Sequence, residues 1–453
     1  MEVRVRIAPS PTGFFHVGTA RTALFNYLFA RQNKGKFLVR IEDTDIERSE
    51  KKYEEDILSE LKWLGLEADE EILKQGDRTE IYKKYLHNLV EKNLAYKCFC
   101  NKEELDAVRA SQMTAGLAPK YNGRCAALIK EEIKAKEVAG QAHVFRLRVP
   151  ENKITFSDLI RGEVTFDGAL IGDIVIAKSD ENVLYNFAVV VDDYEMKISH
   201  VIRGEDHISN TPKQIFIGEA LGFYRPKYAH LPLILDSKRA KLSKRFAAVS
   251  VADYREQGYL PEPFLNFLGL LGWHPKEDRE ILMMEEMVAE FDLERVQKGG
   301  AIFNIEKLDW LNQQYIKNLS NEKLLGLLNK PVDGKNLKII NLVKERLVKL
   351  SDYDSLTGFF FAVPEYEKEL LVWKDGGLEK AKEVLEKLLA LKELNKENIS
   401  SLCEVFGNGP VLWPLRVALS GSKASPGPFE ILEVLEGREV KSRLQVAYNK
   451  VCA

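Results

Sequence analysis

Cysteine and long apolar stretches are scarce in this sequence. Five cysteines among 453 residues are too few for a disulfide scaffold, so we expect reduced thiols and a cytoplasmic protein. No apolar run approaches the roughly 18 residues of a membrane-spanning helix. The N-terminal stretch MEVRVRIAPSPTG alternates charged and apolar residues and has no apolar signal core. We therefore expect neither membrane insertion nor secretion.

Net charge is also small. The chain has 66 Lys and Arg against 69 Asp and Glu, which leaves −3 at pH 7. With 45% hydrophobic and 30% charged residues, the composition excludes a disordered, fibrous or collagen-like protein. A near-neutral total says nothing about nucleic acid, because basic residues can gather on one face. At roughly 150 residues per domain, the length predicts about three domains.

The first 45 residues predict a strand, a helix and a second strand. Residues 3–8 alternate apolar and charged side chains, and Pro and Gly then mark a turn. Apolar residues recur at helical spacing over 20–31, and residues 37–42 form a second apolar run. Such a βαβ unit predicts a parallel, doubly wound sheet.

The next part of the chain has a different sequence pattern. Between His143 and Asp193, five short runs rich in β-branched residues predict strands: HVFRLRV, KITF, GEVTF, DIVIA and FAVVVDD. Strands near 185–204 and 228–236 are expected to complete the first sheet, which makes 96–184 an insertion within it. From Tyr315 onward helix-forming residues dominate, which predicts a helical domain.

Small and polar residues occupy the predicted turn between the first strand and the first helix. Ligands of open α/β sheets bind at the carboxyl ends of strands, and helix N-termini favour phosphate. Glycines let a phosphate approach the backbone, and a histidine at the helix start can donate to a phosphoryl oxygen. The alternative is an ordinary strand–turn–helix corner with one surface histidine. The residues concerned are Ser10, Thr12, Gly13, His16 and Gly18.

Residues 238–245, KRAKLSKR, carry five cations in eight positions. Such a loop can neutralise a polyphosphate while charge moves onto a leaving pyrophosphate. A solvated basic surface loop is the alternative, and it is the usual environment of a charge run.

The two motifs together resemble a known family. The helix-start motif PSPTGxxHVG and the loop KLSKR, about 220 residues apart, resemble the two signatures of class I aminoacyl-tRNA synthetases. The resemblance extends from Val5 to about Tyr315, and it resumes at PLRVALSG from Pro414 and PFEIL from Pro428. Six segments are similar to glutamyl-tRNA synthetase of bacterial type: RIAPSPTG, ARTALFNYLFAR, RIEDTD, YNFAVVVDD, HVIRGEDH and NFLGLLGW.

The resemblance implies a reaction, its partners and a fold. Glutamate and ATP, with Mg²⁺, would form glutamyl-adenylate and diphosphate, and tRNA(Glu) would then accept the glutamate with release of AMP. We expect a monomer. The implied α/β architecture has four parts: a Rossmann-type parallel-sheet catalytic domain (1–95 and 185–245), an inserted α+β acceptor-stem-binding domain (96–184), a stem-contact junction (246–314) and an all-helical anticodon-binding domain (315–453).

Glutamate-binding positions of the family match Arg6, Ser10, Glu42, Tyr185 and Arg203. The chemistry agrees with this match. Arg6 ends a strand at the ligand edge and offers a guanidinium fork to a side-chain carboxylate. Glu42 ends the second strand at the same edge and can accept from the substrate ammonium group. Without the motif context, a surface arginine on a strand would describe Arg6 equally well.

ATP-binding positions of the family match Thr12, His16, Gly18, Lys241, Ser243 and Lys244, of which His16, Lys241 and Lys244 would act in catalysis. The sequence departs from the general signatures at several places. Thr19 stands where the broader class often has a second histidine, and Leu242 and Arg245 replace Met and Ser. Val189 stands where some relatives carry a polar asparagine that faces the substrate, so that contact is not carried over.

Cysteines in the insertion form a second candidate site. Cys98 and Cys100 on a strand would point to one face, and zinc takes tetrahedral thiolates. Relatives with zinc in this insertion use such cysteines, which brings in Cys125 and a fourth ligand near it. Ala127 occupies the position where some relatives have histidine, and Tyr121 is then the nearest oxygen donor. Three reduced structural thiols remain the alternative to a zinc site.

Several competing functions are weighed against this interpretation. Glutaminyl-tRNA synthetase shares both signatures but usually ends in β-barrels, which the helix-forming tail disfavours. A truncated relative that glutamylates a tRNA base lacks an anticodon domain. A non-catalytic tRNA-binding paralogue would be expected to lose His16 or the loop lysines, which are present. Charging of tRNA(Gln) depends on how anticodon-contacting residues treat the third anticodon base. Arg346 is either one of them or an ordinary surface arginine.

Overall fold

The chain folds into two compact units. The computed structural model describes residues 2–45, 47–242, 250–374 and 376–453. The N-terminal unit comprises residues 1–256 and 261–305, and the C-terminal unit comprises residues 257–260 and 306–453. The chain therefore passes from one unit to the other three times, at 256/257, 260/261 and 305/306.

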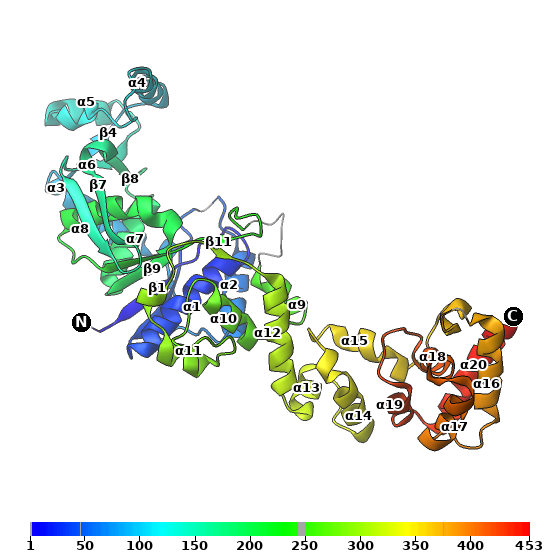
Figure 1. The fold of residues 1–453 in the computed structure, drawn as a ribbon. Helices are drawn as coiled ribbons and strands as arrows, with labels where there is room; N and C mark the ends of the chain where they lie inside the picture. The colour runs from blue at the N-terminus through cyan, green and yellow to red at the C-terminus, as the bar shows by residue number, and fades with distance from the viewer. Residues whose placement is uncertain (1, 46, 243–249, 375) are drawn as a thin grey trace. The chain divides into compact units, whose positions relative to one another are not determined.

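Parallel strands at the start of the chain build the first sheet of the N-terminal unit. Strands β1 (Arg4–Ile7), β2 (Lys36–Ile41) and β3 (Leu73–Lys74) pair in parallel in the order β1-β2-β3, with Val5 opposite Phe37. Helix α1 (Val17–Gln32) connects the first two strands (Figure 1). The predicted βαβ unit and parallel sheet are confirmed.

Strands from later in the chain continue this layer. Strand β9 (His200–Gly204) pairs in parallel with β10 (Lys227–Leu231). The β9 side of this pair lies beside β1, where the Ser199 backbone N–H donates to the Arg4 carbonyl oxygen over 2.9 Å (Figure 1). The expectation that 185–204 and 228–236 complete the first sheet holds only in part: β9 lies beside β1, but β9 and β10 belong with strands from the insertion to a sheet separate from β1-β2-β3, and residues 185–195 are helical.

One predicted strand was wrong. The run FAVVVDD lies in helix α7 (Tyr185–Glu195), which follows β8 (Ile174–Ala177). Five of its residues are buried: Phe187, Ala188, Val189, Val191 and Asp192. The pairs 187/191 and 188/192 are four residues apart, which puts each pair on one face of a helix. A short apolar run has no clear periodicity, so its packing against the sheet decided between strand and helix.

Segment 96–184 contributes to two sheets. Strands β6 (Lys153–Asp158) and β7 (Gly162–Asp167) form an antiparallel hairpin, and Asp158 of β6 is opposite Tyr228 of β10. A separate antiparallel sheet contains β4 (Ala95–Cys98), β5 (Val144–Leu147) and β8 in the order β4-β5-β8. Helices α4 (Lys102–Thr114) and α5 (Lys130–Val138) lie beyond this sheet and contain no buried residue (Figure 1).

Further helices and a short strand pair complete the N-terminal unit. Some of these helices bury side chains at helical spacing, as at Tyr82, Leu86 and Leu89. The elements are α2 (Lys51–Trp63), α3 (Thr79–Glu91), α6 (Gly168–Ile171), α8 (Thr211–Leu221), β11 (Ile234–Leu235), α9 (Val251–Glu256), α10 (Pro261–Leu270), α11 (Met284–Glu290) and β12 (Ala301–Ile302).

Helices alone form the described regular structure of the C-terminal unit, as the composition predicts. They are α12 (Ile305–Asn318), α13 (Asn321–Leu327), α14 (Gly334–Val343), α15 (Asp352–Thr357), α16 (Gly377–Ala390), α17 (Lys396–Phe406), α18 (Asn408–Ser420), α19 (Pro428–Leu432) and α20 (Gly437–Cys452). Their buried side chains form one apolar cluster. Over the residues described, no helix is both long and apolar enough to cross a membrane.

Residues 257–260 belong to this helical unit although they are distant from it in sequence. Leu260 is buried in its apolar cluster, and its backbone N–H donates to Asn312 Oδ1 over 2.9 Å. Gly258 accepts from the Leu350 backbone N–H over 2.9 Å. At φ +84°, a Cβ on Gly258 would lie 2.7 Å from the Ser351 nitrogen, so this close approach requires glycine.

Candidate functional site

A cavity of about 630 Å³ lies at the carboxyl ends of β1, β2 and β9. This is the edge at which parallel α/β sheets bind ligands. Eight residues that the sequence predicts for the site line it: Arg6, Ser10, His16, Gly18, Glu42, Tyr185, Arg203 and Lys241. Thr12 is exposed and does not line this cavity. Ser243 and Lys244 lie outside the described residues.

His16 is the N-cap of α1. Its backbone is extended, and its Nδ1 accepts from the Gly18 backbone N–H over 2.9 Å. Because Nδ1 is the acceptor, the neutral ring carries its hydrogen on Nε2 and can donate there. A Cβ at position 18 would lie 3.1 Å from this nitrogen, so the His16 ring would have to shift slightly to admit a side chain there. The helix start therefore presents its N-terminal end to the cavity, where an anion is favoured.

The described residues on both sides of the signature loop are attached near this helix start. On one side, the Leu242 backbone N–H donates to the Ile234 carbonyl oxygen over 3.0 Å. On the other, the Val251 backbone N–H donates to the Phe15 carbonyl oxygen over 2.9 Å. Lys241 Nζ lies 3.3 Å from Asp206 Oδ2 and is exposed. Lys241 thus brings a positive charge, paired with Asp206, to the lining of the cavity.

Arginines and carboxylates form a buried network beneath the cavity. Arg6 donates from Nε and Nη2 to the two Asp193 oxygens over 3.0 and 3.2 Å. Arg40 is fully buried and donates to Asp193 over 2.7 Å and to Glu42 over 3.0 Å. Burial disfavours the charged form of Asp193, but Arg6 and Arg40 outweigh it and hold the pKa of Asp193 below its usual value. Sequence reasoning missed Arg40 and Asp193, since only the fold brings them together.

Glu42 differs from Asp193 within the same network. Burial raises the pKa of Glu42, and the attraction of Arg40 and Arg6 does not fully offset that rise. Its backbone is held by Ser10, whose hydroxyl donates to the Glu42 carbonyl oxygen over 2.9 Å. Only one Glu42 oxygen pairs with Arg40, so the carboxylate retains acceptor capacity toward the cavity.

Arg203 has only neutral hydrogen-bond partners among the described residues. Its side chain donates to His230 Nε2 over 3.2 Å, to Gln214 Oε1 over 2.8 Å and to Thr211 Oγ1 over 2.7 Å. Arg203 is 6% exposed, and burial lowers its pKa. A buried guanidinium that lines the cavity without a carboxylate is suited to an incoming anion.

Tyr185 and His207 lie on the same wall. The Tyr185 hydroxyl is 3.1 Å from His207 Nδ1. Burial, followed by the nearby Arg203, lowers the pKa of His207 to about 4, so the ring is neutral at pH 7. His207 was not predicted as a site residue, although it belongs to the quoted segment HVIRGEDH. The signal was present, but one histidine gave no reason to select it.

The arrangement suits a zwitterionic amino acid beside a phosphate compound. Arg6 and Arg203 offer guanidinium groups to carboxylates, and Glu42 offers an acceptor to an ammonium group. The N-terminus of α1 and Lys241 lie on the same cavity and favour phosphate. The amino acid and the phosphate compound would therefore bind in the same cavity.

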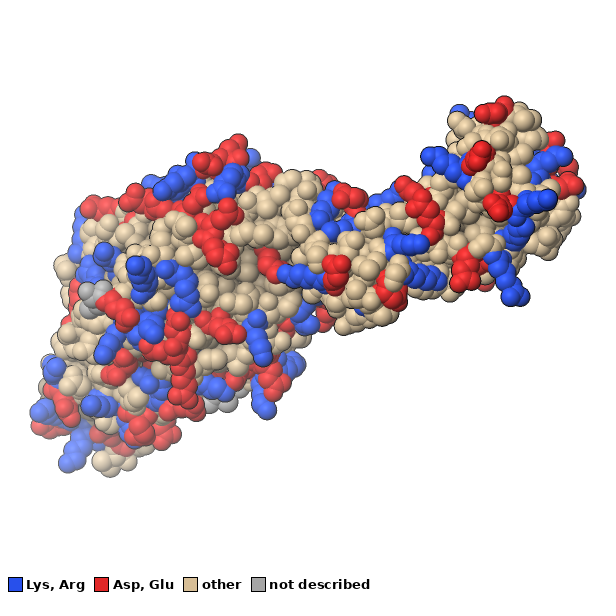
Figure 2. All heavy atoms as spheres, turned by 90° about the horizontal axis from the view of Figure 1, so that it is seen from below, with Lys and Arg blue, Asp and Glu red and all other residues tan. Residues whose placement is uncertain are grey.

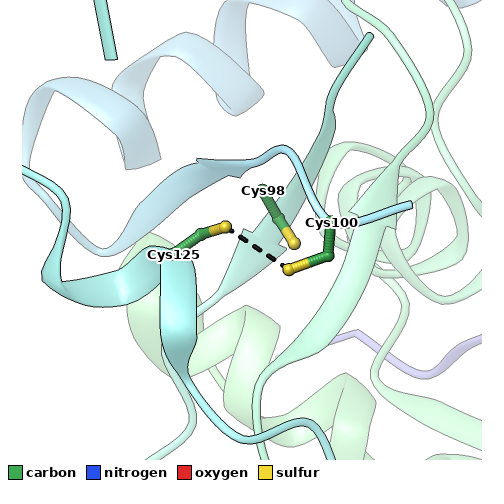
Figure 3. Close-up of side chains that lie close together, drawn as sticks. All are labelled: Cys98, Cys100 and Cys125. Atoms are coloured by element: carbon green, nitrogen blue, oxygen red, sulfur yellow. Dashed lines mark hydrogen bonds between the residues drawn. The ribbon is translucent and has the colours of Figure 1, made fainter. Parts of the chain in front are cut away.

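The three insertion cysteines converge (Figure 3). Cys100 Sγ lies 3.5 Å from Cys125 Sγ, and the ligand atoms of Cys98, Cys100 and Cys125 all lie within 4.8 Å of one another. Tyr121 Oη lies 3.4 Å from Cys98 Sγ and 3.5 Å from Cys100 Sγ. Only Cys98 is in β4, so the common direction of the thiols also depends on the turn after it.

The surroundings of Cys98 and Cys100 shift their pKa values in opposite directions. Burial disfavours the Cys98 thiolate, but hydrogen bonding with Tyr121 and the Cys100 backbone outweighs it and lowers the pKa of Cys98, whereas burial raises the pKa of Cys100 to about 11. The Arg146 guanidinium lies 3.9 Å from the centre of the Tyr121 ring. The three thiols at these separations match the cysteine ligands of a tetrahedral zinc site, whereas burial raises the pKa of Tyr121 and opposes the phenolate form that a fourth ligand would need.

Comparisons with known proteins cover the whole chain. Residues 2–310 match the family model of the class I tRNA synthetase (E and Q) catalytic domain, and residues 303–448 match an anticodon binding domain. Glutamate–tRNA ligase 2 of Thermoanaerobacter pseudethanolicus is 44% identical, over 99% of this chain and 98% of its own. The glutamate–tRNA ligase of Thermodesulfovibrio yellowstonii is also 44% identical, over 98% of each chain.

A solved structure agrees with these sequences. The crystal structure of a glutamate tRNA ligase from Elizabethkingia meningosepticum in complex with its amino acid is similar, with a TM-score of 0.88 and 36% identity. The similarity covers 100% of both chains.

Proposed function

The chain belongs to the glutamate–tRNA ligases, a family of class I tRNA synthetases, and from this premise we propose that it attaches L-glutamate to tRNA(Glu) with ATP. Glutamate and ATP form glutamyl-adenylate and diphosphate, and tRNA then takes the glutamate and releases AMP. The observation that carries the proposal is the single cavity in which Arg6, Glu42 and Arg203 accompany the phosphate-suited start of α1.

Within this proposal, the residues at the strand ends hold glutamate. Arg6 and Arg203 bind its carboxylates, and Glu42 accepts from its ammonium group. Ser10 keeps the Glu42 backbone in place, and the Tyr185 hydroxyl, which lies beside His207, contributes a hydrogen bond.

ATP occupies the helix-start side of the same cavity. His16 donates from Nε2 to a phosphate oxygen, and the backbone at Gly18 allows the phosphate to approach. Lys241 and Lys244 stabilise charge on the departing diphosphate, with Ser243 as a further ATP contact; Thr12, which does not line the cavity, is assigned no contact. Magnesium, bound with ATP, neutralises phosphate charge. Of these residues, His16, Lys241 and Lys244 are the catalytic ones.

The remaining segments contact tRNA. We assign 96–184 to the acceptor stem, 246–314 to the stem-contact junction and 315–453 to the anticodon, with 1–95 and 185–245 as the catalytic domain. The two helices α4 and α5 support this assignment, because their faces bury nothing and remain available to a partner. We further propose that the enzyme acts as a cytoplasmic monomer.

The ATP–pyrophosphate exchange reaction tests the proposed activity. Exchange is expected with glutamate and not with glutamine, and only when tRNA(Glu) is present. Charging of a tRNA(Gln) transcript measures whether the enzyme also accepts that tRNA. Exchange that depends on glutamine, or none with any substrate combination, would contradict the proposal.

We also propose that Cys98, Cys100, Cys125 and Tyr121 bind zinc. The support is the convergence of their four ligand atoms. Protein from zinc-supplemented growth is expected to contain about one zinc per chain. Cys100→Ser should release the metal and lower tRNA charging more than glutamate activation, whereas Cys403→Ser, in the C-terminal unit, should change neither. Metal-free protein with normal charging would leave three structural thiols.

A further inference from the structure

Three buried side chains connect the insertion hairpin to the cavity. Asp158 ends β6, His230 lies in β10 and Arg203 lies in β9. Asp158 Oδ2 is 2.6 Å from His230 Nδ1, and His230 Nε2 is 3.2 Å from Arg203 Nε. Asp158, His230 and Arg203 are 2%, 0% and 6% exposed. Of the three, only Arg203 lines the cavity.

Hydrogen bonding determines where the protons of this chain of contacts lie. Asp158 Oδ1 accepts from the backbone N–H groups of Ile160 and Arg161 over 3.0 and 2.8 Å, so the carboxylate is stabilised as an anion. Its other oxygen faces His230 Nδ1, which must then carry the ring hydrogen. An arginine Nε only donates, so His230 Nε2 must accept. Burial lowers the pKa of His230, in agreement with this neutral ring.

This arrangement orients Arg203 without neutralising it. His230, Gln214 and Thr211 together take three of the five guanidinium N–H groups, and all three partners are uncharged. Two N–H groups remain for a ligand in the cavity. Arg6 differs, because two of its nitrogens are already paired with the Asp193 carboxylate. Arg203 therefore keeps more of its charge for an incoming anion.

We propose that Asp158 and His230 are positioning residues for glutamate binding: Asp158 sets the His230 tautomer, and His230 then holds Arg203 with a lone pair and not with a negative charge. The inference rests on the proposed function, in which Arg203 binds a glutamate carboxylate. A carboxylate placed directly against Arg203 would orient it equally well but would compete with the substrate.

The substitution Asp158→Asn tests the tautomer. An amide N–H directed at His230 Nδ1 makes that nitrogen the acceptor and moves the ring hydrogen to Nε2, where it opposes Arg203 Nε–H. Measured by tRNA-dependent exchange, the KM for glutamate is expected to rise about tenfold or more, while the KM for ATP stays within about twofold. Nitrogen-15 shifts of labelled histidine should report Nδ1 protonation in the wild type and Nε2 protonation in the variant.

A second substitution separates positioning from folding. The double variant Asp158→Asn/His230→Gln restores an acceptor, because glutamine Oε1 can take the place of Nε2. It should bind glutamate more tightly than Asp158→Asn alone, a rescue that a purely structural role would not produce. Asp173→Asn is the matched control, since Asp173 accepts from Tyr96 Oη over 2.6 Å and from the Val149 backbone over 2.9 Å and does not line the cavity.

The outcomes are distinct. Wild-type protein that shows no glutamate-dependent exchange would overturn the proposed function itself. Active wild type with Nε2 protonated, an unchanged glutamate KM in Asp158→Asn, or equal rises in both KM values would overturn the positioning role alone. If Asp158→Asn does not fold, His230→Leu against His230→Gln decides the question: only the leucine variant should lose glutamate affinity.

Discussion

The two units differ in what they bury. The N-terminal unit buries arginines and carboxylates beneath its cavity, among them Arg40, Glu42 and Asp192. In the described part of the C-terminal unit, Arg443 is the only buried charged side chain, and the helices otherwise enclose apolar residues and a few uncharged polar ones such as Asn312 and Thr357. Basic and acidic side chains mix over the surface of both units on the face that Figure 2 shows.

This difference corresponds to two ways of binding. Burying charge is unfavourable unless every group is paired, so the N-terminal network is stable only as a complete set. Such a set holds its guanidinium groups in place before a small ligand arrives. An apolar helical core supplies stability without this requirement and leaves recognition to surface side chains. The comparison predicts different responses to substitution in the two units.

The largest effect is expected from Arg40→Met, which removes the most deeply buried cation of the network. Glu42 and Asp193 would lose a partner, and the N-terminal unit should be destabilised by about 3–5 kcal/mol. Hydrogen exchange of peptides from each unit measures this, and only N-terminal peptides should respond. Arg31→Met, which breaks the surface pair with Asp69, is the control, with an expected loss of about 0–1 kcal/mol. Equal losses would show that burial does not matter here.

A substitution in the core of the C-terminal unit should destabilise that unit and leave the N-terminal unit unchanged. Leu385 is fully buried in the C-terminal cluster, and Leu385→Ala should cost about 2–5 kcal/mol of that unit's stability through lost burial and a cavity. The exchange protection of the N-terminal sheet should be unchanged. Leu327→Ala, at a side chain 42% exposed, provides the comparison and should be nearly neutral. Loss of protection in both units would mean that they unfold together.

Acidification should destabilise the N-terminal unit more than the C-terminal unit. The difference should be smaller than that caused by either core substitution. All seven histidines precede residue 275 and lie in the N-terminal unit. Burial lowers the pKa values of His200 and His207 to about 4, so these rings bind protons in the unfolded chain before they do so in the folded unit. Stability is therefore present above the unfolded pKa of about 6.5 and is lost as the pH falls toward 4.

His207 alone should contribute a loss of about 2 kcal/mol by pH 5. Hydrogen exchange at pH 7 and pH 5, corrected for the intrinsic exchange rate, gives the measurement. Protection in the N-terminal unit should decrease and protection in the histidine-free C-terminal unit should change less. A larger decrease in the C-terminal unit would reverse the comparison.

The smallest effect on stability is expected at an exposed C-terminal arginine. Arg346→Ala should change the unfolding free energy by less than about 0.5 kcal/mol, because the side chain is exposed. If it contacts the anticodon, the KM for tRNA should rise while tRNA-independent properties stay constant. An unchanged KM for both tRNA(Glu) and tRNA(Gln) would identify it as an ordinary surface residue.

The sequence predicted the features that depend on residues adjacent in the chain. The turn and helix start that contain Ser10, His16 and Gly18 are adjacent in the chain, so their place at the sheet edge followed from the βαβ pattern. The Arg6–Asp193 pairing did not follow, because it joins residues 187 positions apart. The same holds for Asp158 and His230, whose contact depends on the register of β6 against β10. A single sequence does not indicate the register between strands that are distant in the chain.

The threefold passage of the chain between the units has a consequence for cleavage. Cutting the peptide bond between residues 305 and 306 would not by itself give two independent fragments. The first fragment would still carry residues 257–260, whose Gly258 and Leu260 remain hydrogen-bonded within the helical unit. A protease nick there should therefore leave a non-covalent complex that migrates as one species under native conditions and separates only in denaturant.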